Sequence, residues 1–212
     1  MVSRPDLGLW AVADGAGGHA RGDVAARMAV EALEAIPTDL TPDALLAEVR
    51  QRLADTHAAL LASRTGDPPD LSASTIVVLV ACGESVACLW AGDSRAYLSR
   101  KGRLEQVTRD HSLVQELIDA GAISAAQAKT HPHANVITRA LGADGELDLE
   151  EVCHDLRSGD RFLLCSDGLC KTVPPEELSR LLQNGAPADA LIAAALAHQG
   201  RDNVTAVVIE NL

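Results

Sequence analysis

Aromatic residues, long apolar runs and clustered basic residues are all scarce in this sequence. Aromatics make up 2% of the 212 residues, so we expect no stacking platform for single-stranded nucleic acid. The net charge of −12 also argues against nucleic acid, because clustered lysine and arginine hold phosphate backbones. No apolar run approaches the roughly 18 residues of a membrane span, and the first residues do not resemble a signal peptide. These features predict a soluble cytoplasmic protein with no nucleic-acid or membrane partner.

Cysteine is also sparse, and its spacing argues against a zinc site. There are five cysteines, an odd number, and their spacings match no zinc-ligand pattern. Most of them lie in or beside apolar runs. That placement is typical of reduced thiols in the core of a cytosolic protein. Cys165 and Cys170 have a C-x4-C spacing, which leaves redox pairing of these two as an alternative.

Apolar residues are plentiful, at 47%, so one domain with a core of Leu, Val, Ile and Ala is the default at this length. Apolar periodicity separates the strands from the helices. The predicted strands are 7–13, 74–81, 85–91, 95–99, 104–107, 147–154, 161–165 and 204–209. The predicted helices are 19–36, 41–61, 111–120, 123–127, 176–183 and 188–198. Because strands and helices occur in blocks and do not alternate, we predict an α+β layered fold with antiparallel sheets.

Four short acidic motifs are the most informative feature of the chain. Their aspartates are Asp14, Asp93, Asp167 and Asp202; the first three follow an apolar run and the fourth precedes one. Taken singly, each has a structural interpretation as a helix cap, a turn or a hairpin. Four such carboxylates, beside small residues that let the backbone come close, are better explained as ligands for hard divalent cations. The sequence therefore predicts metal-assisted chemistry.

The first motif is a glycine-rich turn that needs to be distinguished from a phosphate-binding loop. Its sequence is Asp14-Gly15-Ala16-Gly17-Gly18-His19. It lacks the Lys and Ser/Thr of a P-loop and the spacing of the dinucleotide-binding G-x-G-x-x-G. Because an aspartate opens the turn, a cation is a better ligand than an anion.

The four motifs together resemble those of the metal-dependent serine/threonine protein phosphatases of the PP2C (PPM) family, bacterial branch. The matching motifs are Asp14-Gly15-x-Gly17-Gly18-His19, Gly92-Asp93-Ser94-Arg95, Ser166-Asp167-Gly168-Leu169 and Asp202-Asn203. Residues 108–112 and 137–142 also look like family segments. The resemblance implies a four-layer αββα sandwich, with two antiparallel sheets packed face to face and helices outside.

The resemblance also implies a ligand set for two Mn2+ or Mg2+ ions at one end of the sheets. Asp14 would bridge the two ions, and the backbone carbonyl of Gly15 would bind one of them. Asp167 and Asp202 would hold the other ion. Asp93, together with Asp167, would form a weaker site for a third ion.

The same resemblance assigns the remaining roles. His19 would be the general acid for the leaving alcohol, and a flap subdomain at about 110–142 would shape substrate access. The implied reaction is hydrolysis of phosphoserine and phosphothreonine by water that the metal pair activates. The implied partners are phosphorylated proteins, with a cognate Ser/Thr kinase as one candidate, and the expected state is a monomer.

The N-terminus departs from the family pattern. The family begins with a strand that carries a phosphate-gripping arginine and an acidic metal ligand, whereas only thirteen residues precede Asp14 here. Residues 1–6 look like the turn after that strand; Arg4 and Asp6 stand at the wrong positions, and Pro5 disfavours a strand. We therefore expect one sheet to lack a strand, either because the sequence is truncated or because the native protein is short here.

Two alternative functions remain open at this point. The missing N-terminal groups favour a catalytically impaired, phosphoprotein-binding regulatory domain on the same fold. The four retained aspartates favour an active enzyme. A different metal hydrolase with similar carboxylates is a more distant alternative, since the chain has no H-E-x-x-H motif.

Overall fold

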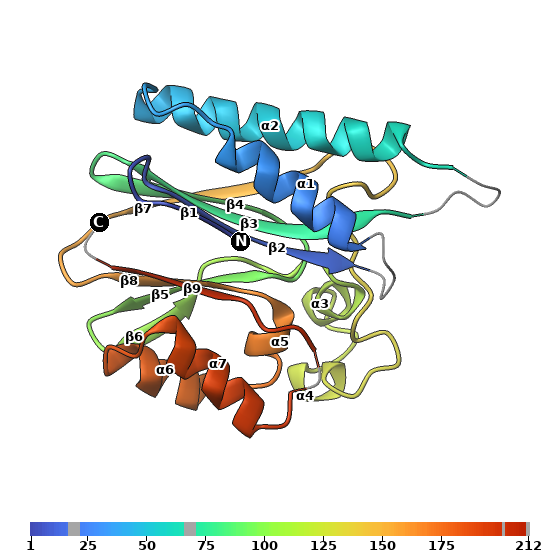
Figure 1. Ribbon diagram of the computed structural model, residues 1–212. Helices are drawn as coiled ribbons and strands as arrows, with labels where there is room; N and C mark the ends of the chain where they lie inside the picture. The colour runs from blue at the N-terminus through green and yellow to red at the C-terminus, as the bar shows by residue number, and fades with distance from the viewer. Residues whose placement is uncertain (17–21, 66–70, 201, 211–212) are drawn as a thin grey trace.

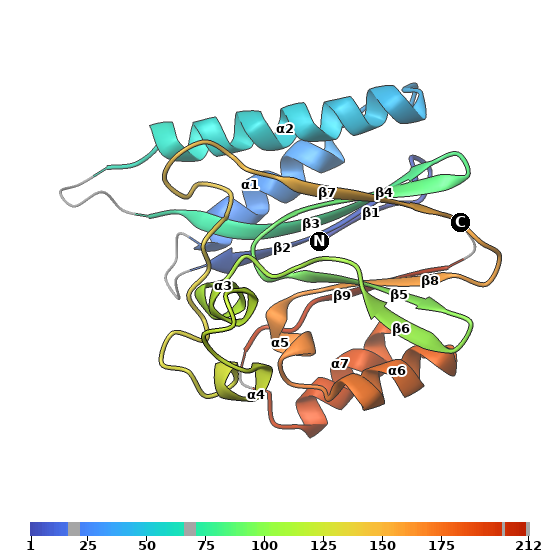
Figure 2. The ribbon, with the colours of Figure 1, turned by 180° about the vertical axis from the view of Figure 1, so that it is seen from behind.

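Two antiparallel β-sheets stacked face to face, with helices on both outer faces, form the fold of the computed structural model (Figure 1). The structure describes residues 1–16, 22–65, 71–200 and 202–210. The same four layers appear from behind in Figure 2. The predicted α+β sandwich is therefore confirmed.

Each sheet has a simple strand order. The first sheet runs β1-β2-β3-β4-β7, and the second runs β6-β5-β8-β9. The strands of the first sheet are β1 (Val2–Arg4), β2 (Leu9–Ala16), β3 (Ala73–Cys82), β4 (Ser85–Ala91) and β7 (Glu150–Asp155). Those of the second are β5 (Arg95–Arg100), β6 (Arg103–Gln106), β8 (Arg161–Cys165) and β9 (Ala206–Glu210).

Helices cover both outer faces and one end of the sandwich. Helices α1 (Gly22–Glu34) and α2 (Pro42–Ala62) lie on the first sheet, while α6 (Pro175–Gln183) and α7 (Ala188–Ala197) lie on the second. The short helices α3 (Leu113–Asp119), α4 (Ala125–Ala128) and α5 (Asp167–Cys170) lie together at one end (Figures 1 and 2).

Alternating side chains on the central strands explain the layers. On β3, Ile76 and Val78 pack against α1 and α2, whereas Val77 and Leu79 pack between the sheets. Successive residues of a strand point to opposite faces, so a strand that is apolar at every position is buried on both faces. Each fully buried aliphatic side chain stabilises the fold by about 1.5–3 kcal/mol. This double burial holds the strand ends at fixed positions.

The N-terminal segment corrects one sequence-based expectation. Residues Val2–Arg4 are a strand, because they pair antiparallel with β2 in the register Val2↔Ala11. The turn begins only at Pro5, whose carbonyl accepts from the Gly8 amide at 3.2 Å. Pro5 therefore ends a short strand, and the expectation that residues 1–6 contain no strand was wrong.

Arg4 serves this hairpin. Its guanidinium pairs with Asp6 at 2.9 Å and donates to the carbonyls of Glu34 and Ile36 at 2.9 and 3.3 Å. Those carbonyls lie at the C-terminal end of α1 and just beyond it. Arg4 and Asp6 are thus engaged with each other and with the end of α1. These contacts agree with the expectation that the two residues do not replace the family's N-terminal site groups.

The cysteines are free thiols, as expected, but they are not all in the core. Cys88, Cys165 and Cys170 are buried, Cys82 is half-buried and Cys153 is exposed on β7. Cys153 was therefore wrongly placed in the core. Its strand is at the edge of the first sheet, where one face is open to solvent.

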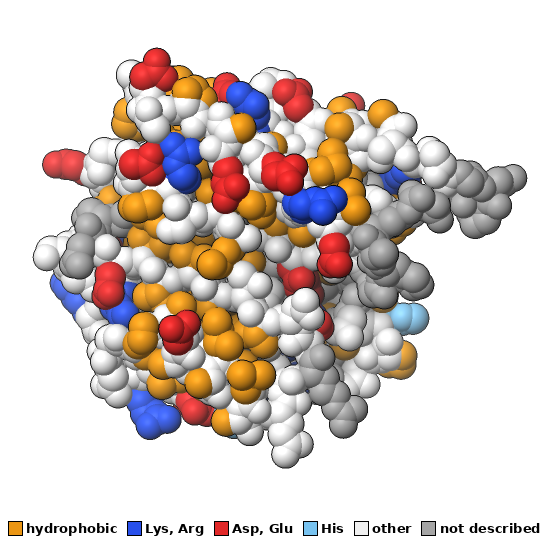
Figure 3. Space-filling model, viewed as in Figure 1, with side chains coloured by type: hydrophobic (Ala, Val, Ile, Leu, Met, Phe, Trp, Pro, Cys, Tyr) orange, Lys and Arg blue, Asp and Glu red, His pale blue; other side chains and the backbone are white. Residues whose placement is uncertain are grey.

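The outer face of the α1–α2 layer carries charges of both signs. Acidic and basic side chains are interspersed over the α1–α2 layer (Figure 3), where Arg27 pairs with Glu31 and Arg52 with Glu48. Across the described residues, none of the helices has the length and apolar character that a membrane crossing requires.

Candidate metal centre

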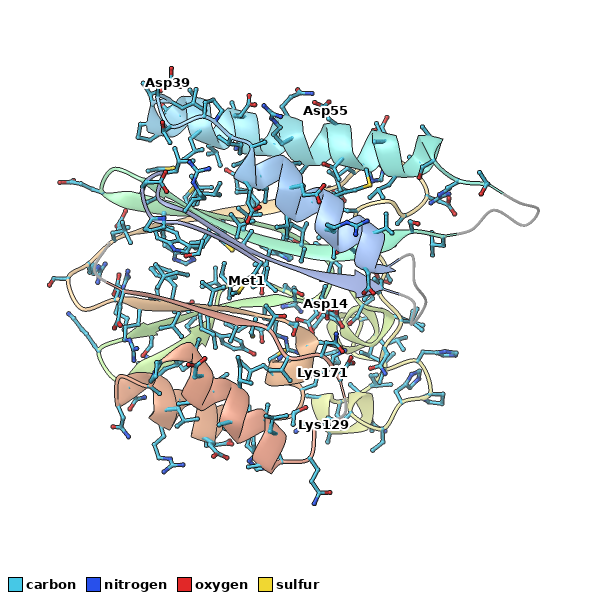
Figure 4. The ribbon with its side chains drawn as sticks, viewed as in Figure 1. Met1, Asp14, Asp39, Asp55, Lys129 and Lys171 are labelled. Atoms are coloured by element: carbon cyan, nitrogen blue, oxygen red, sulfur yellow. The ribbon has the colours of Figure 1, made fainter. Side chains whose placement is uncertain are left out.

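The fold brings the four predicted aspartates to one end of the sandwich. Asp14 lies near the end of β2 in the first sheet. In the second sheet, Asp93 shortly precedes β5, Asp167 follows β8 and Asp202 shortly precedes β9. Because β5 and β9 are both antiparallel to β8, their first residues lie beside its last ones. The labelled Asp14 is at this end in Figure 4.

The pKa of the Asp14 carboxyl reflects its burial and the negative charge of the aspartates around it. Burial, and then the charges of Asp167, Asp202 and Asp93, raise the pKa of its carboxyl from 3.8 to about 7. Like charges within several ångströms disfavour ionisation, and a nearby cation reverses the effect. This end of the molecule is therefore built to favour a bound cation.

The loop that carries Asp93 is packed tightly against β3. Gly92 has φ +117°, a conformation that favours glycine, and a Cβ there would lie 2.6 Å from the Thr75 Cβ. The hydroxyls of Thr75 and Ser94 share a buried hydrogen bond of 2.7 Å. Thr75 is also the register partner of Asp14 on β2. These contacts fix the Asp93 loop relative to the strand that carries Asp14.

Ser166 couples the Asp167 motif to the Asp202 motif. Its fully buried hydroxyl donates to the Asn203 carbonyl at 3.3 Å and accepts from the Thr205 amide at 3.0 Å. Gly168 allows the approach, since a Cβ there would lie 2.2 Å from the Asn203 carbonyl oxygen. The two acidic loops are thus held against each other by backbone contacts.

Lys171 was not predicted from the sequence to be part of the site, yet its side chain contacts two of the four aspartates directly. Its ammonium donates to Oδ2 of Asp93 at 2.6 Å and to Oδ2 of Asp167 at 2.9 Å. Burial lowers the pKa of this ammonium, but the two ion pairs outweigh that effect and raise it above the ordinary value. The spacing Asp167…Lys171 suits a helical ion pair, but the sequence did not predict the short helix that brings the two together.

A partly buried ion pair anchors residues 108–112 to the Asp93 motif. Arg95 donates twice to the Asp110 carboxylate, at 2.8 and 2.7 Å, and once to the Tyr97 hydroxyl at 3.0 Å. Two parallel N–H···O bonds are the geometry in which arginine binds a carboxylate most strongly. The anchor explains why residues 108–112 accompany the Gly92–Arg95 motif.

His111 provides a second anchor. Its backbone amide donates to the Gly92 carbonyl at 2.9 Å, and its Nδ1 accepts from the Gly92 amide at 3.3 Å. Its Nε2 lies 2.9 Å from the Glu150 carboxylate and 3.4 Å from the Arg139 guanidinium. The buried ring also stacks on Trp90, with centroids 5.9 Å apart.

The donor set fits a hard divalent cation. It consists of carboxylate and carbonyl oxygens, which suit Mg2+ and Mn2+, whereas Zn2+ prefers His and Cys. In the part of the chain that the structure describes, no three His, Cys, Asp or Glu side chains surround a common point. Asp93 and Asp167 meet at Lys171, Asp14 and Asp202 lie within electrostatic range, and Gly15 is exposed at the end of β2. His19 lies outside the described residues.

Comparison with known proteins shows the family of the chain. A family model described as protein phosphatase 2C matches residues 2–206. The serine/threonine protein phosphatase PstP of Mycobacterium tuberculosis is 38% identical over 207 residues, which are 95% of this chain and 40% of that protein. The chain thus spans less than half the length of this relative.

Solved structures give the same result. PppA of Pseudomonas aeruginosa, described as a key regulatory component of T6SS, is 40% identical with a TM-score of 0.86; the match covers 99% of this chain and 88% of that one. The catalytic domain of PstP, in complex with two manganese ions, is 36% identical with a TM-score of 0.75, covering 94% and 86%. The chain belongs to the protein phosphatase 2C family, and the relatives named here are bacterial proteins of that family.

Proposed function

We propose that this chain hydrolyses phosphoserine and phosphothreonine in proteins through a dinuclear Mn2+ or Mg2+ site. The supporting observation is the gathering of four aspartates from separate strand ends at one end of the sandwich, where burial and then the charges of the other three raise the pKa of Asp14 to about 7. Such charge is relieved by cations, and the chain belongs to a family with a manganese-bound member. Two divalent ions would supply an activated water and charge neutralisation for the phosphoryl group.

Each chain residue then has a defined task. Asp14 would bridge the two ions, with the Gly15 carbonyl on one of them and Asp167 and Asp202 on the other. The hydrogen bonds of Ser166 would keep the last two loops together. His19, which lies outside the described residues, would protonate the leaving serine or threonine oxygen; that role depends on its motif.

Residues 110–142 are proposed to be a flap on an otherwise single domain at 1–212. Two isolated β-bridges close the base of this segment. One joins Ser112 to Ile137 within the segment, and the other joins Leu141 to Ser74 on β3. Between these bridges lie α3 and α4, on the side of the sandwich where Asp14 is found (Figure 4). A segment fixed at its base and exposed at its tip could shape access for a protein substrate.

The partners follow from the reaction. We propose phosphorylated proteins as substrates, with a cognate Ser/Thr kinase as one candidate, a monomeric state and a cytoplasmic location.

The test is release of phosphate from a phosphothreonine peptide with and without Mn2+. We expect turnover that needs Mn2+, disappears with a chelator and returns when Mn2+ is restored. Asp167→Asn should lower kcat strongly. Asp39→Asn, an exposed aspartate at the other end of the molecule (Figure 4), should leave it unchanged.

Two outcomes would reject the proposal. One is the absence of Mn2+-dependent turnover by the folded chain. The other is equal turnover in Asp167→Asn and wild type. Tight phosphopeptide binding with no turnover would instead support the phosphoprotein-binding alternative.

A further inference from the structure

Lys171 joins three separate parts of the chain at the acidic end. Its ammonium lies 2.6 Å from Asp93 Oδ2 on the β4–β5 loop and 2.9 Å from Asp167 Oδ2 at the start of α5. It also lies 3.5 Å from the Asn135 side-chain oxygen, within residues 110–142. Its side chain is 32% exposed, whereas that of Asp93 is 7% exposed. The ammonium is therefore inserted between two carboxylates, one of them almost fully buried.

The position of the ammonium is the one that a metal ion at this carboxylate pair would need. Both contacts use Oδ2 atoms, and those two oxygens converge on a single point that Lys171 Nζ occupies. Carboxylate oxygens facing each other repel unless a cation lies between them. Divalent cations and ammonium groups seek the same oxygens. A metal ion can reach this point only by displacing Lys171.

Displacement is costly because Lys171 is covalently attached. Its Cα is fixed by α5, where the Lys171 amide donates to the Asp167 carbonyl at 2.8 Å. A tethered group competes at a high effective concentration, in the millimolar range for short flexible links and higher for rigid ones. A weakly held ion would lose this competition.

We propose that Lys171 is a tethered cation that closes the Asp93–Asp167 pair to divalent ions. The pair was expected, from family resemblance, to hold a weak third ion; the contacts of Lys171 disagree with that expectation. The inference concerns the same end of the molecule as the proposed function, and rests on it for the neighbouring metal ions. Its test measures bound metal and does not need turnover.

The experiment counts bound Mn2+ by electron paramagnetic resonance titration and native mass spectrometry. Lys171→Gln removes the charge and should bind one more Mn2+ per chain than wild type. Lys171→Arg keeps a cation at this position and should bind the wild-type number. Lys129→Gln is the matched control, because Lys129 is an exposed lysine at the C-cap of α4 (Figure 4), and it should also bind the wild-type number.

A double variant assigns the additional ion. Lys171→Gln combined with Asp93→Asn should return to the wild-type number, because one of the two carboxylates is then neutral. Thermal melting provides an independent readout: added Mn2+ should raise the Tm of Lys171→Gln more than that of wild type, since the unpaired carboxylates gain a ligand. Far-UV circular dichroism checks that each variant is folded.

The outcomes separate this inference from the proposed function. An equal Mn2+ count and an equal Mn2+-induced Tm shift in Lys171→Gln and wild type would overturn the role of Lys171, whatever the turnover. A gain of one ion in Lys171→Gln supports it even if the chain hydrolyses no phosphopeptide. A gain that persists in the double variant would also overturn it, because the ion would lie elsewhere.

Discussion

Replacing Gly168 with alanine sets two physical effects against each other. Gly168 lies in the short helix α5, and in an unobstructed helix alanine is about 1 kcal/mol more favourable than glycine. In this fold, however, the new Cβ would lie 2.2 Å from the Asn203 carbonyl oxygen. An ordinary carbon–oxygen contact is about 3.3 Å, so the Asp167 and Asp202 loops would have to separate by about 1 Å. We expect the clash to win.

The magnitude follows from overpacking. Forcing extra volume into a packed site costs about 1–3 kcal/mol, which lowers the Tm of a chain of this size by roughly 2–12 °C. Because the loops that separate carry two proposed metal ligands, Mn2+ affinity should also fall by about 10–100-fold. Calorimetry with a chelator measures the first effect and isothermal titration with Mn2+ the second.

A control separates this clash from backbone strain. Gly102 has φ +76°, and a Cβ added there would stand in open space, with no heavy atom within 4 Å. Gly102→Ala should therefore lower the Tm without changing Mn2+ affinity. If Gly168→Ala is as stable as wild type or more so, and binds Mn2+ equally well, the close contact between the two loops does not exist as described.

The remaining predictions concern charge and buried hydrogen bonds. Without metal, the elevated pKa of Asp14 means that its contribution to stability is greatest below pH 4 and falls as pH rises to about 7, by about 1–2 kcal/mol after solvent screening; Asp14→Asn should remove this contribution in melts at pH 5 and 8. Ser166→Ala should cost about 1 kcal/mol in urea unfolding, because the Asn203 carbonyl and the Thr205 amide lose a partly buried hydrogen-bond partner. Asp110→Ala should cost about 1.5–3 kcal/mol, because Arg95 loses its carboxylate partner and keeps only the Tyr97 hydroxyl, and an unchanged urea midpoint would contradict that reading.

The strands and the acidic positions could be predicted from sequence because their signals are local. The β3 segment from Ile76 to Val80 is apolar at every position, which indicates a strand buried on both faces. Asp93 and Asp167 each stand at the end of such a run. Strand ends gather at the edges of sheets, so their grouping followed from the topology.

Other features depend on contacts between distant residues and left little trace in the sequence. The three-residue strand β1 is held by pairing with β2, which overrides the local signal of Pro5. Helix α5 is only four residues long, too short for an apolar period. Lys171 looks like an ordinary surface lysine until the fold brings Asp93 to it from 78 positions away.

The proposed chemistry depends on divalent ions being held between carboxylates that arrive from separate strands. Anomalous diffraction at the manganese edge, from crystals soaked in Mn2+, tests this directly. We predict manganese peaks bounded by Asp14, Asp167 and Asp202, with Lys171 still on the Asp93 carboxylate. Ordered aspartates at these positions with no manganese peak among them would contradict it.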